Sequence, residues 1–178
     1  TDGHVLTYST SSGGIVLSAA SGGGGGGASE INDLSDAKTN ATSVGLGTNA
    51  LAALTATDRS VTAVGICALA SNTTGVMNVA IGADALKQAV NTYDTVAVGF
   101  NAIRSMQTSA VGHSNVAVGS MAMYSNTAGR YNVAIGKAAM RSVTSGDCNI
   151  FMGFKSGYGN ASTGGSNVGI GHHALKNY

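Results

Sequence analysis

The sequence predicts an all-β fold, a parallel β-roll or β-solenoid whose coils are about 17 residues long. The first observation is a five-residue phrase, N-V-A-I-G at residues 78–82, that is one of eight in-phase copies, the others being identical or variants such as N-V-A-V-G and S-V-G-L-G. The second is its period, because the glycines that close the phrase are 17 to 20 residues apart. These glycines are Gly47, Gly65, Gly82, Gly99, Gly119, Gly136, Gly153 and Gly171. The third is composition: 27 glycines, no proline and only 10% charged residues are unlike an ordinary globular domain.

The residues before the repeat predict two further segments. Residues 1–20 form a β-hairpin-like segment, because residues 4–8 alternate and are β-rich, and residues 15–17 return after a turn. Residues 21–41 form a glycine-rich linker followed by a solvated, acidic lead-in. The repeat domain then occupies residues 42–178.

Each repeat begins with a short strand. In N-V-A-I-G, Val79 and Ile81 share one face and Ala80 points to the other. The closing Gly82 permits a corner that a side chain would obstruct. A small-plus-large pair such as Ala85-Leu86 follows the corner, and we expect the large residues to stack in the core. The expected repeat core is Val79, Ile81, Leu86, Val96, Val98, Val116, Val118, Val133, Ile135, Val168 and Ile170.

The segment after the corner is expected to be a second short strand. Residues 83–90 would suit two helical turns on propensity, but the matching residues 121–127 would not. The asparagine that opens most copies of the phrase predicts a side-chain ladder along the stack. Its members are Asn78, Asn115, Asn132, Asn149 and Asn167.

Two features concern cross-linking and assembly. Cys67 and Cys148 lie four coils apart, roughly 19 Å at the spacing of β-strands, so we predict two free thiols. A rod of eight such coils has little volume for a core of its own, which favours identical chains that share one. Trimers are the common solution in fibrous β proteins, although the spacing does not itself give the number three.

The phrases N-V-A-I-G-x-x-A-L and S-N-T-T-G-x-x-N-V-A-I-G (residues 71–82) resemble repeats of bacteriophage tail-fibre and related virion fibre proteins. They are also similar to the head repeats of trimeric autotransporter adhesins. The resemblance covers residues 42–178. The opening V-L-T-Y and the stretch I-N-D-L-S-D-A at residues 31–37 resemble linkers of phage fibres, which favours the phage family.

The resemblance implies an intertwined or side-by-side homotrimer whose Val and Ile positions face inward. It implies a non-catalytic structural and host-attachment segment in the extracellular virion. The implied partners are a host-surface glycan or protein and other virion tail proteins. Such fibres often carry a self-cleaving C-terminal chaperone, so Tyr178 is expected to be a mature end. The departures are the coils of 18 and 20 residues and the seventh coil, where Ser156-Gly157 replaces Ala-Leu.

No cofactor or metal is expected. Residues 45–50 and 169–174 fit the dinucleotide fingerprint G-x-G-x-x-G/A, but the required βαβ unit is missing. His172 and His173 could meet their symmetry mates around a metal ion, although neighbours on a strand point to opposite faces. An ordinary surface or core pair is the preferred interpretation. A net charge of +1 gives no reason to expect nucleic acid, and no apolar run reaches the roughly 20 residues of a membrane span.

Catalysis is not expected, but two alternatives of function remain open. A glycan-degrading tailspike would need paired carboxylates, and the repeat region offers only Asp58, Asp84, Asp94 and Asp147. A bacterial trimeric surface adhesin would share the architecture, but it would belong to a bacterial surface instead of a virion. An ice-binding solenoid is disfavoured because threonine does not keep one phase from coil to coil.

The candidate receptor-contact residues lie around the longest coil, residues 100–114. Insertions in a solenoid map to loops that are often on the binding face. The candidates are Tyr93, Arg104, His113, Arg130 and Tyr131. The competing interpretation is that they are ordinary loop residues.

Overall fold

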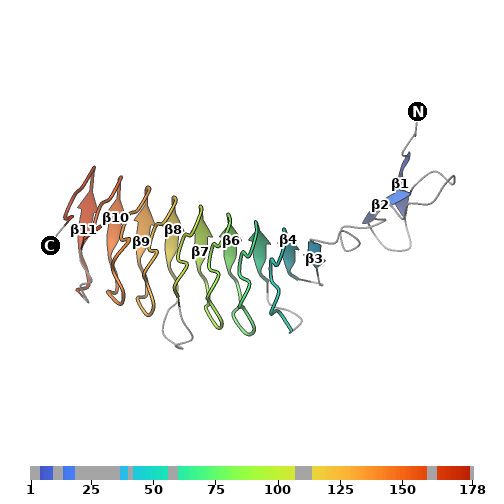
Figure 1. Cartoon of the computed structure of the whole chain (residues 1–178), viewed down its shortest axis with the longest axis horizontal. Coiled ribbons are helices and arrows are strands. Elements are labelled where there is room, and N and C mark those ends of the chain that lie inside the picture. Colours follow the sequence, from blue (N-terminus) through green and yellow to red (C-terminus); the bar gives the residue numbers. More distant parts are fainter. Residues whose placement is uncertain are drawn as a thin grey trace.

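The computed structural model describes residues 5–9, 14–18, 37–39, 42–55, 60–106, 114–159 and 164–176. In this part of the chain the structure is all-β and contains no helix. Parallel strands stack into a β-solenoid of about seven turns (Figure 1). The predicted solenoid is therefore confirmed.

The segment before the solenoid contains an antiparallel pair, β1 (Val5–Ser9) and β2 (Gly14–Ser18), where the hairpin was expected. Most of the expected linker and lead-in lies outside the described residues. Its described part is a strand, β3 (Ala37–Thr39), which pairs antiparallel with β4. These three residues therefore cover one edge of the solenoid sheet.

The solenoid sheet has one strand of three residues from each coil, in sequence order. The parallel strands are β4 (Val44–Leu46), β5 (Thr62–Val64), β6 (Val79–Ile81), β7 (Val96–Val98), β8 (Val116–Val118), β9 (Val133–Ile135), β10 (Ile150–Met152) and β11 (Val168–Ile170). Equivalent residues pair directly, so that Val96 stands between Val79 and Val116. The phase of the sequence repeat is thus the register of the sheet.

The two faces of each strand are the reverse of the expected ones. Ala80, at the centre of β6, is fully buried, whereas Val79 is half-buried and Ile81 is 41% exposed. Within a single chain the predicted core is therefore wrong at the ten strand positions, which lie on the outer face. These are Val79, Ile81, Val96, Val98, Val116, Val118, Val133, Ile135, Val168 and Ile170. The eleventh residue, Leu86, is buried as predicted.

Side-chain size explains the reversal. A strand's alternation separates two faces but does not say which is inside, and a coil of about 17 residues encloses a narrow interior. Alanine methyl groups from the strands meet larger side chains from the segment after the corner, and together they form one core cluster. The alanines are Ala63, Ala80, Ala97, Ala117 and Ala134, and the larger residues are Leu51, Leu69, Leu86, Ile103, Met123 and Met140.

The segment after each corner is a run of turns, so the expected second strand is wrong. In the third coil Asp84 and Leu86 both have positive φ, 58° and 50°. The amide of Asp84 donates to the carbonyl of Ile66 in the preceding coil (2.9 Å), and the amide of Leu86 donates to that of Ala102 in the next (3.0 Å). Stacking thus satisfies these backbone groups in a conformation that non-glycine residues rarely adopt alone.

The corner requires glycine for two reasons. Gly82 has φ 127°, and a β-carbon there would lie 2.7 Å from the carbonyl carbon of Gly99. The coils can approach this closely only because the column of corners carries no side chains. The sequence prediction for this position is confirmed.

The predicted asparagine ladder is confirmed from Asn115 to Asn167, but Asn78 is not part of it, because Thr95 occupies the next position and donates its backbone amide to Asn78 Oδ1 (3.1 Å). Asn132 is fully buried, and its Oδ1 accepts from the backbone amide (2.9 Å) and the Nδ2 (3.1 Å) of Asn149. Its own Nδ2 donates to the carbonyl of Gly146 at 2.7 Å. The same contacts link Asn115 to Asn132 and Asn149 to Asn167. Each side chain therefore satisfies buried backbone groups that the strand leaves unpaired.

The departure in the seventh coil has a packing explanation. Phe151 occupies the strand position that is alanine or glycine in the other coils, and its ring is fully buried. A β-carbon on Gly157 or on Gly169 would lie 2.7 Å from Phe151 Cδ1. The ring therefore fills the space that a leucine or methionine takes elsewhere, and Ser156 Oγ donates to the carbonyl of Gly169 (2.8 Å).

Cys67 and Cys148 are both free, as predicted. The described part of the chain contains no helix with the length and hydropathy of a membrane span.

Candidate functional site

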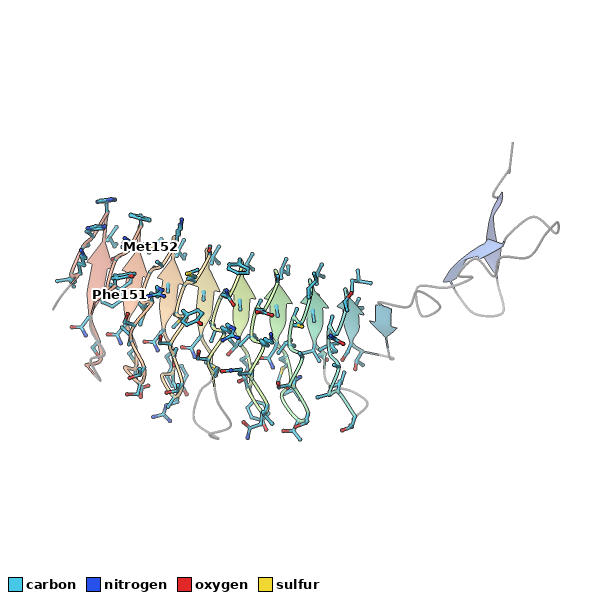
Figure 2. All side chains as sticks on the ribbon, viewed as in Figure 1. Phe151 and Met152 are labelled. Atoms are coloured by element: carbon cyan, nitrogen blue, oxygen red, sulfur yellow. The ribbon has the colours of Figure 1, made fainter. Side chains whose placement is uncertain are left out.

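The outer surface of the sheet is an aliphatic face, made by the first and third residues of β4–β11. Its members are Val44, Leu46, Thr62, Val64, Val79, Ile81, Val96, Val98, Val116, Val118, Val133, Ile135, Ile150, Met152, Val168 and Ile170. Exposure within one chain reaches 69% at Ile170. Figure 2 labels the neighbours Phe151 and Met152 on β10; the first is buried and the second, 36% exposed, belongs to this face. A monomeric soluble protein rarely leaves so long an apolar surface in water.

A second surface feature is a column of cations and tyrosines, here called the cation–tyrosine ladder. Its members stand five residues after successive corner glycines, one in each of six coils: Lys87, Arg104, Tyr124, Arg141, Tyr158 and Lys176. All six are half-buried. Backbone bonds between coils set their spacing, because the amides of Ser105 and Ser125 donate to the carbonyls of Tyr124 (3.2 Å) and Arg141 (3.0 Å).

Arg141 is the centre of this ladder. Its guanidinium carbon lies 5.4 Å from the ring centroid of Tyr124 and 5.7 Å from that of Tyr158. Its Nη1 donates to the hydroxyl of Tyr158 at 3.2 Å. Arg104 repeats the arrangement with Tyr124. Its guanidinium carbon lies 6.0 Å from the ring centroid, and its Nη1 donates to the hydroxyl at 3.4 Å. Cation–π contact and the hydroxyl bonds thus hold each arginine in place.

The ladder has a neutralised end and a positive end. Asp84 pairs with Lys87 at 3.0 Å and with Arg104 at 3.6 Å. At the other end Lys155 places its Nζ 5.1 Å from the ring centroid of Tyr158. Within the described ranges neither Arg141 nor Lys155 forms an ion pair with a carboxylate. Positive charge is therefore concentrated around Arg141 and Lys155.

The structure divides the predicted receptor-contact residues between different columns. Tyr93 and Arg130 share the position six residues before a corner glycine, and Tyr131, 57% exposed, is in the next column. Asp147 holds Arg130 at two points. Its Oδ2 accepts from Arg130 Nη2 at 3.1 Å, and its Oδ1 accepts from the backbone amide of Arg130 at 2.8 Å. Arg104 belongs to the cation–tyrosine ladder instead, and His113 lies outside the described residues. The four described candidates are therefore divided between separate columns of the solenoid.

Sequence reasoning missed Tyr124, Arg141 and Tyr158. A signal was present, because all three have the phase of Arg104 relative to their corner glycines. Aligning the repeats by that glycine, and reading each position as a column, would have found them.

Of the four carboxylates considered for catalysis, two form ion pairs, one is exposed, and one lies outside the described residues. Asp84 and Asp147 are each held by cations rather than by a second carboxylate. Asp94 is exposed, and Asp58 is outside the described part.

His172 and His173 form a stacked pair in the last described coil. Their ring centroids are 4.2 Å apart with an interplanar angle of 6°, and Phe154 stacks on both, at 5.3 and 5.6 Å. The expectation that they point to opposite faces is wrong, because His173 has φ 56° in a turn, not a strand. Desolvation, and then the positive charges of His172, Lys176 and Lys155, lower the pKa of His173. No group of three or more metal-ligating side chains is found within the described residues.

Comparison of the chain with protein-family models, curated proteins and solved structures finds no match in any of the three. The aliphatic face and the cation–tyrosine ladder are therefore the basis for assigning a function.

Proposed function

We propose that this chain is a structural and host-attachment segment of a virion fibre, without catalytic activity, and that it acts as a homotrimer. The observation that carries the proposal is the aliphatic face. Its sixteen positions run along eight parallel strands in register, so one chain presents a straight apolar surface to water.

The energetics favour covering this face with identical copies. Burying one Val or Ile side chain contributes about 1.5–3 kcal/mol, and association costs about 4–15 kcal/mol. Fifteen of the sixteen positions are apolar, and each is already partly buried within one chain, so it contributes only part of this amount. About a third of it, summed over fifteen positions, is about 8–15 kcal/mol, which is of the same size as the cost. Three chains around an axis would turn every copy of the face inward and close the assembly. The resemblance to trimeric fibre repeats supports three, and places Val and Ile inside the trimer although they are outside the single chain.

Sedimentation of the purified chain tests the assembly. The expected particle has three times the 17.5 kDa mass of the chain. Val116→Lys, in the middle of the aliphatic face, is expected to yield a folded monomer, whereas the control Tyr131→Lys, at a residue 57% exposed, remains a trimer. A stable wild-type monomer contradicts the proposal.

The place of the chain in a particle needs a separate measurement. Electron microscopy of virions labelled with an antibody against this chain is expected to mark the tail fibres. Labelling of bacterial surfaces instead would assign the chain to a surface adhesin. Release of reducing sugar from host capsule by the purified trimer would contradict the non-catalytic assignment.

A further inference from the structure

We propose that the cation–tyrosine ladder, together with the adjoining Lys155, binds a linear acidic polysaccharide whose carboxylates pair with Arg141 and Lys155. The polysaccharide lies along the solenoid axis, across several coils. This inference rests on the proposed attachment function, since it names the chemical class of the host-surface partner and the surface that recognises it.

The charge distribution of the chain supports an anionic partner at this end. Residues 114–178 contain five Lys or Arg and one Asp, a net charge of +4. Residues 1–59 contain two Lys or Arg and five Asp or Glu, a net charge of −3. The overall charge of +1 therefore conceals a basic C-terminal half. An anion is attracted to the half of the rod that carries Arg141 and Lys155.

The hydrogen-bonding groups of the ladder suit a carboxylate. Arg141 has five N–H donors, and its described side-chain hydrogen bond uses Nη1, toward Tyr158. The remaining donors can take a carboxylate in the bidentate manner that arginine favours. Because the hydroxyls of Tyr124 and Tyr158 accept bonds from arginines, each keeps its own hydrogen to donate. Phenol and guanidinium together form a row of donors for the oxygens of a glycan.

The repeat of the ladder suits a linear polymer. Successive members are one coil apart, about 4.8 Å along the axis, close to the length of one pyranose unit in an extended chain. Arg104 and Arg141 are two coils apart, about 10 Å, so they match alternate sugars. The contacts of the ladder order these side chains before binding, which lowers the entropy cost of association.

The same contacts disfavour nucleic acid. Single-stranded nucleic acids are held by bases stacked on open aromatic faces. Here Arg141 lies over the rings of both Tyr124 and Tyr158, and Lys155 approaches the second ring as well. With four cations in six coils, the ladder is also sparse compared with the phosphate spacing of a duplex.

The test measures binding of the trimer to immobilised alginate, a linear polyuronate, beside neutral pullulan and a single-stranded dT20 oligonucleotide. Alginate is expected to bind at 150 mM NaCl and pullulan is not. Arg141→Gln is expected to weaken alginate binding by about tenfold or more, the loss of one charge-assisted pair. Arg141→Lys keeps the charge without the planar fork, so its affinity is expected to be intermediate. Lys137→Gln is the matched control, since it removes one charge from the same half outside the ladder, and its effect is expected to be under threefold.

Three results overturn the proposal: no binding of alginate, equal losses in Arg141→Gln and Lys137→Gln, or tighter binding of dT20 with the same dependence on Arg141. Unchanged melting temperature and trimer mass in each variant exclude misfolding as the cause. If alginate binding fails while the trimer still labels tail fibres, only the assignment of the ladder falls. If a monomeric chain binds alginate through Arg141, the ladder stands and the proposed function falls.

Discussion

Replacing Phe151 by alanine is expected to destabilise the last coils of the solenoid more than any other single truncation in that region. The ring is fully buried, and it stands where Gly157 and Gly169 leave room for it. Truncating a buried phenylalanine to alanine costs about 3–5 kcal/mol, a large part of the 5–15 kcal/mol that stabilises a typical domain. In a solenoid each coil contacts only its neighbours, so this loss of stability affects the neighbouring coils first.

A second substitution makes the prediction specific. Gly157→Leu alone is expected to cost at least about 1–3 kcal/mol, because its β-carbon would lie 2.7 Å from Phe151 Cδ1. Combined with Phe151→Ala, it recreates the alanine and leucine pair of Ala80 and Leu86. The double variant is then expected to lie within about 1–2 kcal/mol of wild type, with the residual void beside Gly169 costing about 1 kcal/mol. Its total destabilisation should be at least about 2 kcal/mol smaller than the sum of the single effects.

The assay is denaturant unfolding followed by circular dichroism at one fixed protein concentration, with amide exchange to locate the loss. Phe154→Ala is the control, since that ring is 38% exposed and its truncation is expected to cost under about 1 kcal/mol. Additive single effects would show that Phe151 and Gly157 do not share one space. Uniform loss of amide protection over all coils would contradict the nearest-neighbour account.

Three further predictions concern the asparagine ladder, the corners and the histidine pair. Asn132→Ala should cost about 2–3 kcal/mol in denaturant unfolding, because it leaves buried backbone groups without partners, and Asn167→Ala, at a half-buried end of the ladder, should cost clearly less. Gly99→Ala places a β-carbon 2.6 Å from the carbonyl carbon of Gly119 in the next corner, whereas the β-carbon of Gly171→Ala meets nothing within 4 Å. Gly99→Ala should therefore lower the melting temperature much further. Equal effects would mean that the positive φ, and not the contact between corners, causes the loss of stability. The pKa of His173 is lowered in the folded chain, so its stabilising effect is present above the ordinary histidine pKa of 6.5 and is lost as pH falls through the folded pKa. His173→Asn should therefore flatten the acid side of a melting-temperature profile, and an NMR titration that puts the pKa of His173 above 6.5 would refute the sign.

Most of the fold could be predicted from the phase of the sequence repeat. Because the closing glycines mark equivalent positions, the register of Val79 with Val96, the glycine corner and the asparagine ladder all follow from aligning the copies. These features depend on backbone geometry, which the repeat imposes equally on every coil.

Two features of the fold could not be predicted from the repeat pattern: which face of the strand lies inside, and the turns that follow the corner. The inner face of the strand is decided by volume, since Ala80 fits opposite Leu86 and Val79 does not, whereas alternation is the same for both faces. The turns after the corner place Asp84 and Leu86 at positive φ, against their local preference, so only the stack explains them. The cation–tyrosine ladder was predictable in principle, but Arg104 and Arg141 are 37 residues apart and become neighbours only when columns are read.

The antiparallel strand β3 gives the rod a blunt beginning. A strand of three residues offers a second chain few backbone groups to pair with, and short edge strands are one means by which natural sheets discourage edge-to-edge growth. The strand β3 also runs antiparallel to the other strands of the sheet, so a second solenoid cannot continue the parallel stack at this edge. Concentrated solutions of the protein should therefore resist fibrillar polymerisation through this end.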